Sequence, residues 1–188
     1  MTSGGTVALM PATVLRHVME PALLPGATGR ADLRAAARAA VVTSLREALA
    51  EVAAPAPGEQ SGPCAVLVVA PARRSLRTTD GRADLGALGL PEAADLAAGA
   101  AAPAGPSLDV VASVAVTLLA AAGWHGAVET VERGAPDGGS TGLDELLLGR
   151  SLVLVALAAD DARLPAGAPA GLAAGQAEVW ALAERWLG

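Results

Sequence analysis

The stretch Cys64-Ala-Val-Leu-Val-Val-Ala70, which is closed by Pro71, decides the fold of this 188-residue chain. It is a continuous apolar run without a polar face, and such runs form strands that are buried on both sides. A second run, Leu152-Val-Leu-Val-Ala156, has the same character. Because a strand that is buried on both sides needs helices above and below it, the two runs predict the centre of an α/β sheet.

Two further segments are predicted to complete the sheet. Residues 6–10 form a short apolar run that stops at Pro11, and a loop rich in proline and glycine follows it. Residues 127–132 alternate apolar with polar side chains, which is typical of a strand nearer the edge of a sheet. The region 71–106 lacks a sustained period, so we expect a long loop there, with room for a short helix at about 92–98.

Several segments have the periodicity of helices. Residues 31–53 place apolar side chains at every third or fourth position. A buried helix is predicted to begin at Ser107, its N-cap, and to end at Gly123. A short helix is expected at 143–148 and the last helix at 171–187.

The alternation of strands and helices along the chain gives the fold class. It predicts an α/β fold with a mostly parallel central sheet of about four strands and helices on both faces. The length fits one domain better than two, so we expect a single domain over residues 1–188.

Composition excludes several classes of function. The chain holds 47 alanines and lacks Phe, Tyr, Ile, Lys and Asn, which points to a very GC-rich genome. Without lysine it can form neither a Schiff base nor a Walker-type phosphate loop. A net charge of -6 opposes binding to a phosphate backbone, and three tryptophans are too few for a base-stacking platform. We therefore expect no nucleic-acid partner.

The sequence also predicts a cytoplasmic protein that does not enter a membrane. Cys64 is the single cysteine, so it forms no intramolecular disulfide and suits a reducing compartment. Residues 1–5 carry no positive charge before an apolar run, unlike a secretory signal. The longest apolar stretch, 110–122, is shorter than the roughly 20 residues that span a bilayer.

One short motif matches a catalytic pattern by letter. Gly138-Gly-Ser140-Thr-Gly142 has the form G-x-S-x-G of a nucleophile elbow, which needs a strand leading directly into the serine. Here a polar turn precedes the serine, and both histidines, His17 and His125, come earlier in the chain. The pattern favours a turn and a helix N-cap.

The two histidines are the only imidazole groups that could act as bases or metal ligands. His17 is expected in the loop after the first strand, and His125 at a turn between a helix and a strand. Two histidines and a carboxylate can hold non-haem iron, but no spacing here places both on one helix face. The favoured interpretation is that both are solvated.

A candidate site is predicted where the strands end. Arg73, Arg74 and Arg77 follow the central strand, together with Arg82, and Asp160 and Asp161 follow the last one. Parallel strands end at the same edge, so these side chains and His17 are expected to approach one another. Arginines there could bind a small carboxylate or phosphate. Alternatively, Asp160 or Asp161 pairs with Arg73 or Arg74 in a structural salt-bridge network.

Four stretches of the chain resemble a known family. They are Pro21-Ala-Leu-Leu-Pro25 with Asp32-Leu-Arg-Ala-Ala-Ala after it; Ala65-Val-Leu-Val-Val-Ala70; Val114-Ala-Val-Thr-Leu-Leu with Gly123-Trp-His-Gly126; and Gly149-Arg-Ser-Leu-Val-Leu-Val-Ala156 leading into Asp160. In this order they are similar to actinobacterial alanine-rich proteins related to the B subunit of class III extradiol ring-cleavage dioxygenases. The resemblance implies the same α/β fold.

The resemblance also implies which positions an iron site would use. Active members of that family hold iron(II) with a histidine just after the first strand, another after a later strand, and a distant glutamate. Met10-Pro11-Ala12 and Ala70-Pro71 stand at the two histidine positions, so neither offers a ligand. We therefore expect no bound metal and no cofactor.

These observations predict a non-catalytic, metal-free relative of the dioxygenases. It would act as a cytoplasmic module that binds a small anionic ligand or a protein partner. The alternative is a divergent enzyme, either an iron-dependent ring-cleavage dioxygenase or a hydrolase that uses acids such as Asp160 and Asp161.

Overall fold

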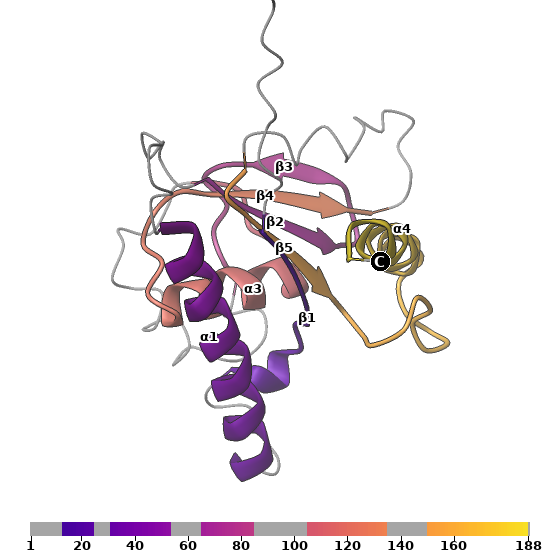
Figure 1. Cartoon of the computed structure of the whole chain (residues 1–188). Helices are drawn as coiled ribbons and strands as arrows, with labels where there is room; N and C mark the ends of the chain where they lie inside the picture. Colours follow the sequence, from indigo (N-terminus) through magenta and orange to yellow (C-terminus); the bar gives the residue numbers. More distant parts are fainter. Residues whose placement is uncertain (1–12, 25–30, 54–64, 85–104, 135–149, 188) are drawn as a thin grey trace, which may run out of the picture.

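A five-stranded sheet with helices on both faces forms the body of the protein (Figure 1). The structure, a computed structural model, describes residues 13–24, 31–53, 65–84, 105–134 and 150–187. The strands are β1 (Thr13–Val18), β2 (Val66–Pro71), β3 (Leu76–Thr78), β4 (Val128–Arg133) and β5 (Leu152–Leu157). The helices are α1 (Ala31–Ala53), α3 (Val110–Ala121) and α4 (Ala170–Leu187), with the 3-10 turn η1 (Pro21–Leu23) after β1.

The two apolar runs lie side by side inside the sheet, as predicted. The strand order is β1-β5-β2-β4-β3, and Val66 of β2 stands opposite Leu152 of β5. Every residue of β2 and β5 is buried. Four strands are parallel, and β3 runs antiparallel to β4 at the end of the sheet. The α/β class is thus confirmed, with five strands in a mixed sheet in place of about four.

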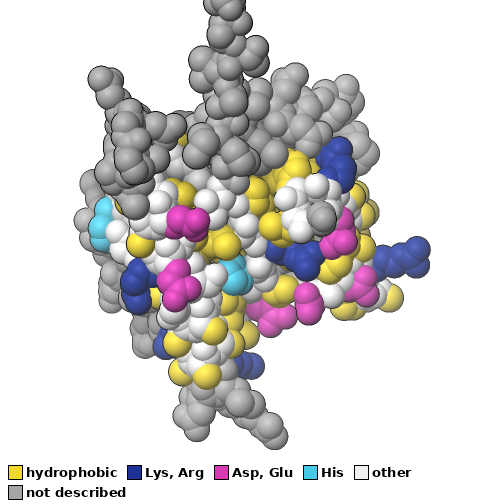
Figure 2. Space-filling model, in the orientation of Figure 1, with side chains coloured by type: hydrophobic (Ala, Val, Ile, Leu, Met, Phe, Trp, Pro, Cys, Tyr) yellow, Lys and Arg dark blue, Asp and Glu magenta, His cyan; other side chains and the backbone are white. Residues whose placement is uncertain are grey.

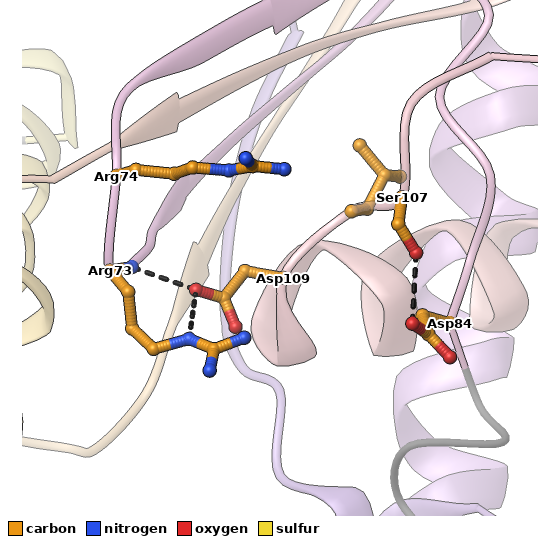
Figure 3. Close-up of a pocket in the computed structure, with 6 residues that line it drawn as sticks. Arg73, Arg74, Asp84, Ser107 and Asp109 are labelled. Carbon is orange, nitrogen blue, oxygen red and sulfur yellow. Dashed lines mark hydrogen bonds and ion pairs between the residues drawn. The ribbon is translucent and has the colours of Figure 1, made fainter.

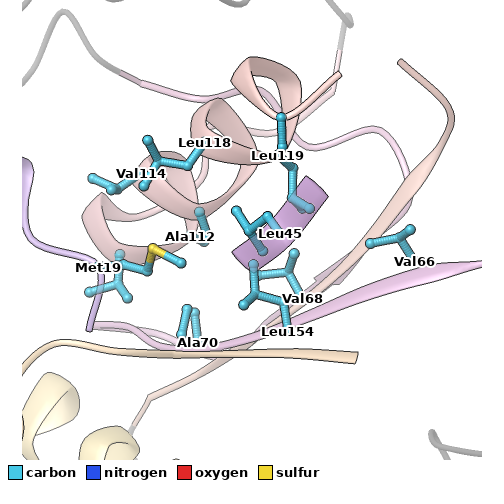
Figure 4. Close-up of a cluster of buried hydrophobic side chains, with 14 of the residues drawn as sticks. Met19, Leu45, Val66, Val68, Ala70, Ala112, Val114, Leu118, Leu119 and Leu154 are labelled. Carbon is cyan, nitrogen blue, oxygen red and sulfur yellow. The ribbon is translucent and has the colours of Figure 1, made fainter. Parts of the chain in front are cut away.

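Side chains that alternate along the central strands supply two separate cores. On one face, Val68 and Leu154 pack with Leu45 of α1 and Leu118 of α3 (Figure 4). On the other face, the residues between them pack against α4, including Leu67, Val69, Val153, Val155, Val179 and Leu182. Burying each such side chain contributes about 1.5–3 kcal/mol, which explains why apolar runs without a polar face occupy the centre.

The helices predicted at 31–53, at 107–123 and at 171–187 are confirmed, with one corrected cap. Helix α3 begins at Val110, and the side chain of Asp109 accepts a hydrogen bond from the backbone N–H of Val110. Asp109, not Ser107, is therefore the N-cap. At the other end Gly123 has a φ of +99°, a left-handed conformation that favours glycine, and the helix ends there as expected.

The prediction for the first strand was wrong for residues 13–18. They form β1, whereas the sequence pattern was interpreted as the start of a loop. Because β1 lies at the end of the described sheet, it tolerates polar residues such as Arg16 and His17 that hide the strand pattern. The strand expected at 6–10 lies outside the described residues.

The long loop expected at 71–106 is interrupted by β3, which is too short to show a period. The short helices expected at 92–98 and 143–148 lie outside the described residues. In the described parts of the chain, no helix combines the length and apolar character that crossing a membrane requires.

Candidate functional site

A cavity of about 320 Å³ opens where β2 ends and α3 begins. Among the described residues, those that line it are Arg73, Arg74, Asp84, Ser107, Leu108 and Asp109 (Figure 3). The two arginines follow the carboxyl end of β2, as the sequence predicted, while the other lining residues come from the segments that lead away from β3 and into α3. The cavity therefore lies at the edge of the sheet where ligands of parallel α/β proteins bind.

Close packing fixes the backbone that carries the two arginines. The N–H of Ala72 donates a hydrogen bond to the carbonyl of Arg133. A Cβ atom on Gly171, in the first turn of α4, would lie 2.2 Å from the carbonyl oxygen of Arg73. Glycine is therefore required where α4 packs on this loop, and the loop is held in one place.

Arg73 is engaged with the cap of α3. Its backbone N–H and its Nε donate hydrogen bonds to Oδ2 of Asp109 at 2.7 and 3.1 Å. The other carboxylate oxygen of Asp109 accepts from the N–H of Val110. Partial burial opposes ionisation of Asp109, but these hydrogen bonds outweigh it and hold its pKa below the ordinary value. Asp109 is therefore a fixed negative charge that ties α3 to the loop.

Arg74 is placed differently. Its exposed side chain extends across the cavity toward Ser107 (Figure 3). Within the described ranges, no side chain forms an ion pair or hydrogen bond with its guanidinium. The hydroxyl of Ser107 instead donates to Oδ2 of Asp84 at 2.9 Å. Arg74 thus offers hydrogen-bond donors to the cavity.

A buried acid lies at the inner end of this arrangement. Glu132, on β4, is 1% exposed, and its carboxylate accepts a hydrogen bond from the backbone N–H of Asp109. Burial raises the pKa of Glu132 to about 7; the charge of Asp109 acts in the same direction, while the Asp109 N–H, Arg74 and Arg73 oppose it. The pKa of this carboxyl therefore lies near neutrality, well above the ordinary value of a glutamate.

Arg77 does not join the cavity. Its Nε donates to Oε1 of Glu129 at 2.6 Å, and Arg150 binds the other oxygen of the same carboxylate. Glu129 is the second residue of β4 and Arg150 precedes β5, so this cluster lies at the amino ends of the parallel strands. The expected approach of Arg77 to Arg73 and Arg74 is corrected, because the antiparallel course of β3 carries it away.

His17 is also placed differently from the prediction. It lies within β1, and its Nε2 is 3.1 Å from the hydroxyl of Ser44 on α1. Burial lowers the pKa of His17. The imidazole is thus half-buried against α1 and does not line the cavity, whereas His125 is exposed as expected.

Asp160 and Asp161 are exposed in the loop after β5. The buried side chain of Gln176 holds this loop, since its amide donates to the carbonyls of Ala159 and Asp161 at 3.0 and 2.7 Å. The carboxylate of Asp161 accepts from the N–H of Arg163. The acid that pairs with Arg73 is Asp109, and no ion pair between these two aspartates and Arg73 or Arg74 is found in the described residues.

Sequence reasoning missed Asp109 and Glu132. Glu132 belongs to the alternating segment that was predicted as a strand nearer the edge of the sheet, and that pattern did not indicate a buried acid. One available signal was its position at the end of β4, beside the edge where the arginines were expected. The pairing of Arg73 with Asp109 joins residues 36 positions apart and depends on where α3 starts.

The surface around these elements carries no large field of one sign in the view of Figure 2. Acidic and basic side chains are interspersed there among apolar ones. This mixture agrees with the modest negative net charge of -6. On this face, recognition of a small anion would therefore depend on local groups and not on a broad basic surface.

The described residues do not fit the iron site that the family resemblance implies. Nowhere in the described ranges do three side chains of His, Cys, Asp or Glu gather as metal ligands would. Ala70-Pro71, at one expected ligand position, forms the buried end of β2. Met10-Pro11-Ala12, at the other, lies outside the described residues.

Comparison of the chain with models of protein families, with curated proteins and with solved structures finds no match in any of the three.

Proposed function

We propose that this chain is a binding module that holds a small carboxylate or phosphate in the cavity beside Arg74. The observation that carries the proposal is the guanidinium of Arg74, which extends across the cavity without a partner among the described side chains. Arginine presents five N–H donors in a planar fork that matches such anions. A metal-free and non-catalytic role is supported by Met10-Pro11-Ala12 and Ala70-Pro71, which stand where the dioxygenases have histidine ligands, and the single cysteine supports a cytoplasmic location.

The construction of the cavity supports a small ligand over a protein partner. A volume of about 320 Å³ is at the lower end of the range for pockets that enclose small molecules. The loop that carries Arg74 is fixed by packing on α4, so the guanidinium is presented from a rigid base. Preorganisation of this kind lowers the entropy lost when a ligand binds.

The local charges indicate modest affinity. Each charge-assisted hydrogen bond from Arg74 contributes on the order of 1.5–3 kcal/mol. Asp84 and Asp109 also line the cavity and repel an anion. Two such bonds correspond to a dissociation constant on the order of millimolar for a simple ion. A natural ligand would add contacts to the rest of the cavity.

The test is a substitution of Arg74 with a matched control. Arg74→Gln removes the charge in the cavity, and Arg46→Gln removes an equal charge from the exposed surface of α1. Sulfate, phosphate and small dicarboxylates should raise the melting temperature of the wild type and of Arg46→Gln by several degrees more than chloride at equal ionic strength. Arg74→Gln should keep its unliganded melting temperature and lose most of that response.

Two results would overturn the proposal. One is a wild-type protein that responds to these anions no more than to chloride. The other is an Arg74→Gln protein that keeps the full response, because the anions would then bind elsewhere or stabilise the fold by exclusion from its surface.

A further inference from the structure

We propose that binding of an anion in the cavity is coupled to protonation of Glu132. The inference rests on the proposed anion-binding function. It concerns a residue that does not line the cavity and that nothing in the sequence pattern marked.

Two carboxyl groups meet at the first turn of α3. Asp109 receives hydrogen bonds from Arg73 and Val110, which fix it in the charged form. Glu132 receives a hydrogen bond from the backbone N–H of Asp109 and is buried beneath the cavity wall. Of the two, Glu132 is therefore the group that can accept a proton.

The charged groups around Glu132 come from three segments. Asp109 faces it from the cap of α3, and Arg73 and Arg74 act on it from the loop after β2. Its partners in the neighbouring strands are uncharged, Ala70 on β2 and Leu76 on β3. The remaining acid of the cavity is Asp84. The two arginines are thus the only positive charges among the described residues that favour the ionised form of Glu132.

An anion on Arg74 changes this balance in one direction. It neutralises a positive charge that favours ionised Glu132 and brings a further negative charge into the same cavity. Both effects raise the pKa of Glu132, which lies near neutrality without ligand. By reciprocity, protonated Glu132 increases the affinity for the anion. We expect affinity to rise on the order of tenfold from pH 8 to pH 6.

Calorimetric titration with sulfate tests this coupling, because sulfate does not itself titrate in this range. The wild type is measured at pH 7 in bis-tris and in imidazole, two cationic buffers with different ionisation enthalpies. A difference between the observed enthalpies gives the number of protons taken up. We expect a clear fractional uptake at pH 7 and weaker binding at pH 8 than at pH 6.

Two matched variants locate the proton. Glu132→Gln keeps an oxygen that can accept from the Asp109 N–H, and it should bind sulfate with no proton uptake and nearly equal affinity at pH 6 and pH 8. Glu184→Gln removes one carboxylate from the exposed Arg16 pair on α4 and should behave as the wild type. A carbon-13 titration of the Glu132 carboxyl in the wild type, with and without sulfate, gives the same answer without a substitution.

The outcomes separate the two proposals. Sulfate binding without proton uptake, at equal affinity at pH 6 and pH 8, contradicts the role of Glu132 and leaves anion binding intact. Uptake that persists in Glu132→Gln assigns the proton to another group and also contradicts the inference. Absence of sulfate binding to the wild type at either pH overturns the proposed function itself.

Discussion

Glu129 and Glu132 are three positions apart on β4, and both are buried, yet they have opposite surroundings. Glu129 lies at the amino end of the strand, where Arg77 and Arg150 each bind one of its carboxylate oxygens. Glu132 lies at the carboxyl end on the other face of the sheet, where its acceptor bond comes from the backbone N–H of Asp109. Glu129, whose carboxylate binds two arginines, stabilises the fold. Glu132 lies beside the cavity and forms no ion pair with a described residue, so its carboxyl can change its charge.

The same substitution should therefore have opposite effects at the two positions. Glu129→Gln should lower the stability of the protein, because it leaves Arg77 and Arg150 without their shared negative charge. Loss of one partner from a buried pair costs about 3–5 kcal/mol, and the half-exposed side chain of Arg77 places the expected loss near the lower end. Urea unfolding at pH 8 measures it. If the free energy of unfolding falls by less than about 1 kcal/mol, the cluster of Glu129 with Arg77 and Arg150 behaves as a surface ion pair.

Glu132→Gln should stabilise the protein at pH 8. The folded state raises the pKa of Glu132 from 4.5 to about 7, so between these values the unfolded chain releases a proton that the folded protein keeps. The free energy of unfolding of the wild type therefore falls as pH rises through this window and stays lower above pH 7.

Glu132→Gln has no carboxyl that titrates at this position, so its free energy of unfolding lacks this dependence on pH. The stability of Glu132→Gln relative to the wild type should rise from near zero at pH 4.5 to roughly 3 kcal/mol at pH 8. Urea unfolding of both proteins across this range, with Glu184→Gln as the charge-matched control, gives the difference. A pH-independent difference would mean that Glu132 does not titrate in this window.

The parts of the fold that could be predicted from the sequence are those whose burial leaves a local pattern in the chain. The strands β2 and β5 were predicted because burial on both faces demands an uninterrupted apolar run. Helices α1, α3 and α4 were predicted from their period and flanking glycines. β1 was missed because a strand at the end of the sheet accepts Arg16 and His17.

The candidate site was predictable only in part. Arg73 and Arg74 follow directly from their position after a buried strand, since parallel strands place such residues at the ligand-binding edge. The roles of Asp109 and Glu132 depend on how α3 packs on the sheet, and no local pattern encodes that packing. Alternation along β4 also cannot distinguish an acid that faces solvent from one covered by a helix.

The most direct test of the account is a nuclear magnetic resonance titration of the wild type and Arg74→Gln with sulfate at pH 6. If Arg74 holds an anion, sulfate should cause saturable shifts in the wild type, concentrated on backbone amides that line the cavity, those of Arg74, Ser107, Leu108 and Asp109. The same amides should show no saturable shift in Arg74→Gln. Shifts that grow linearly with sulfate, or saturable shifts that are equal in both proteins, would contradict the claim that Arg74 holds an anion there.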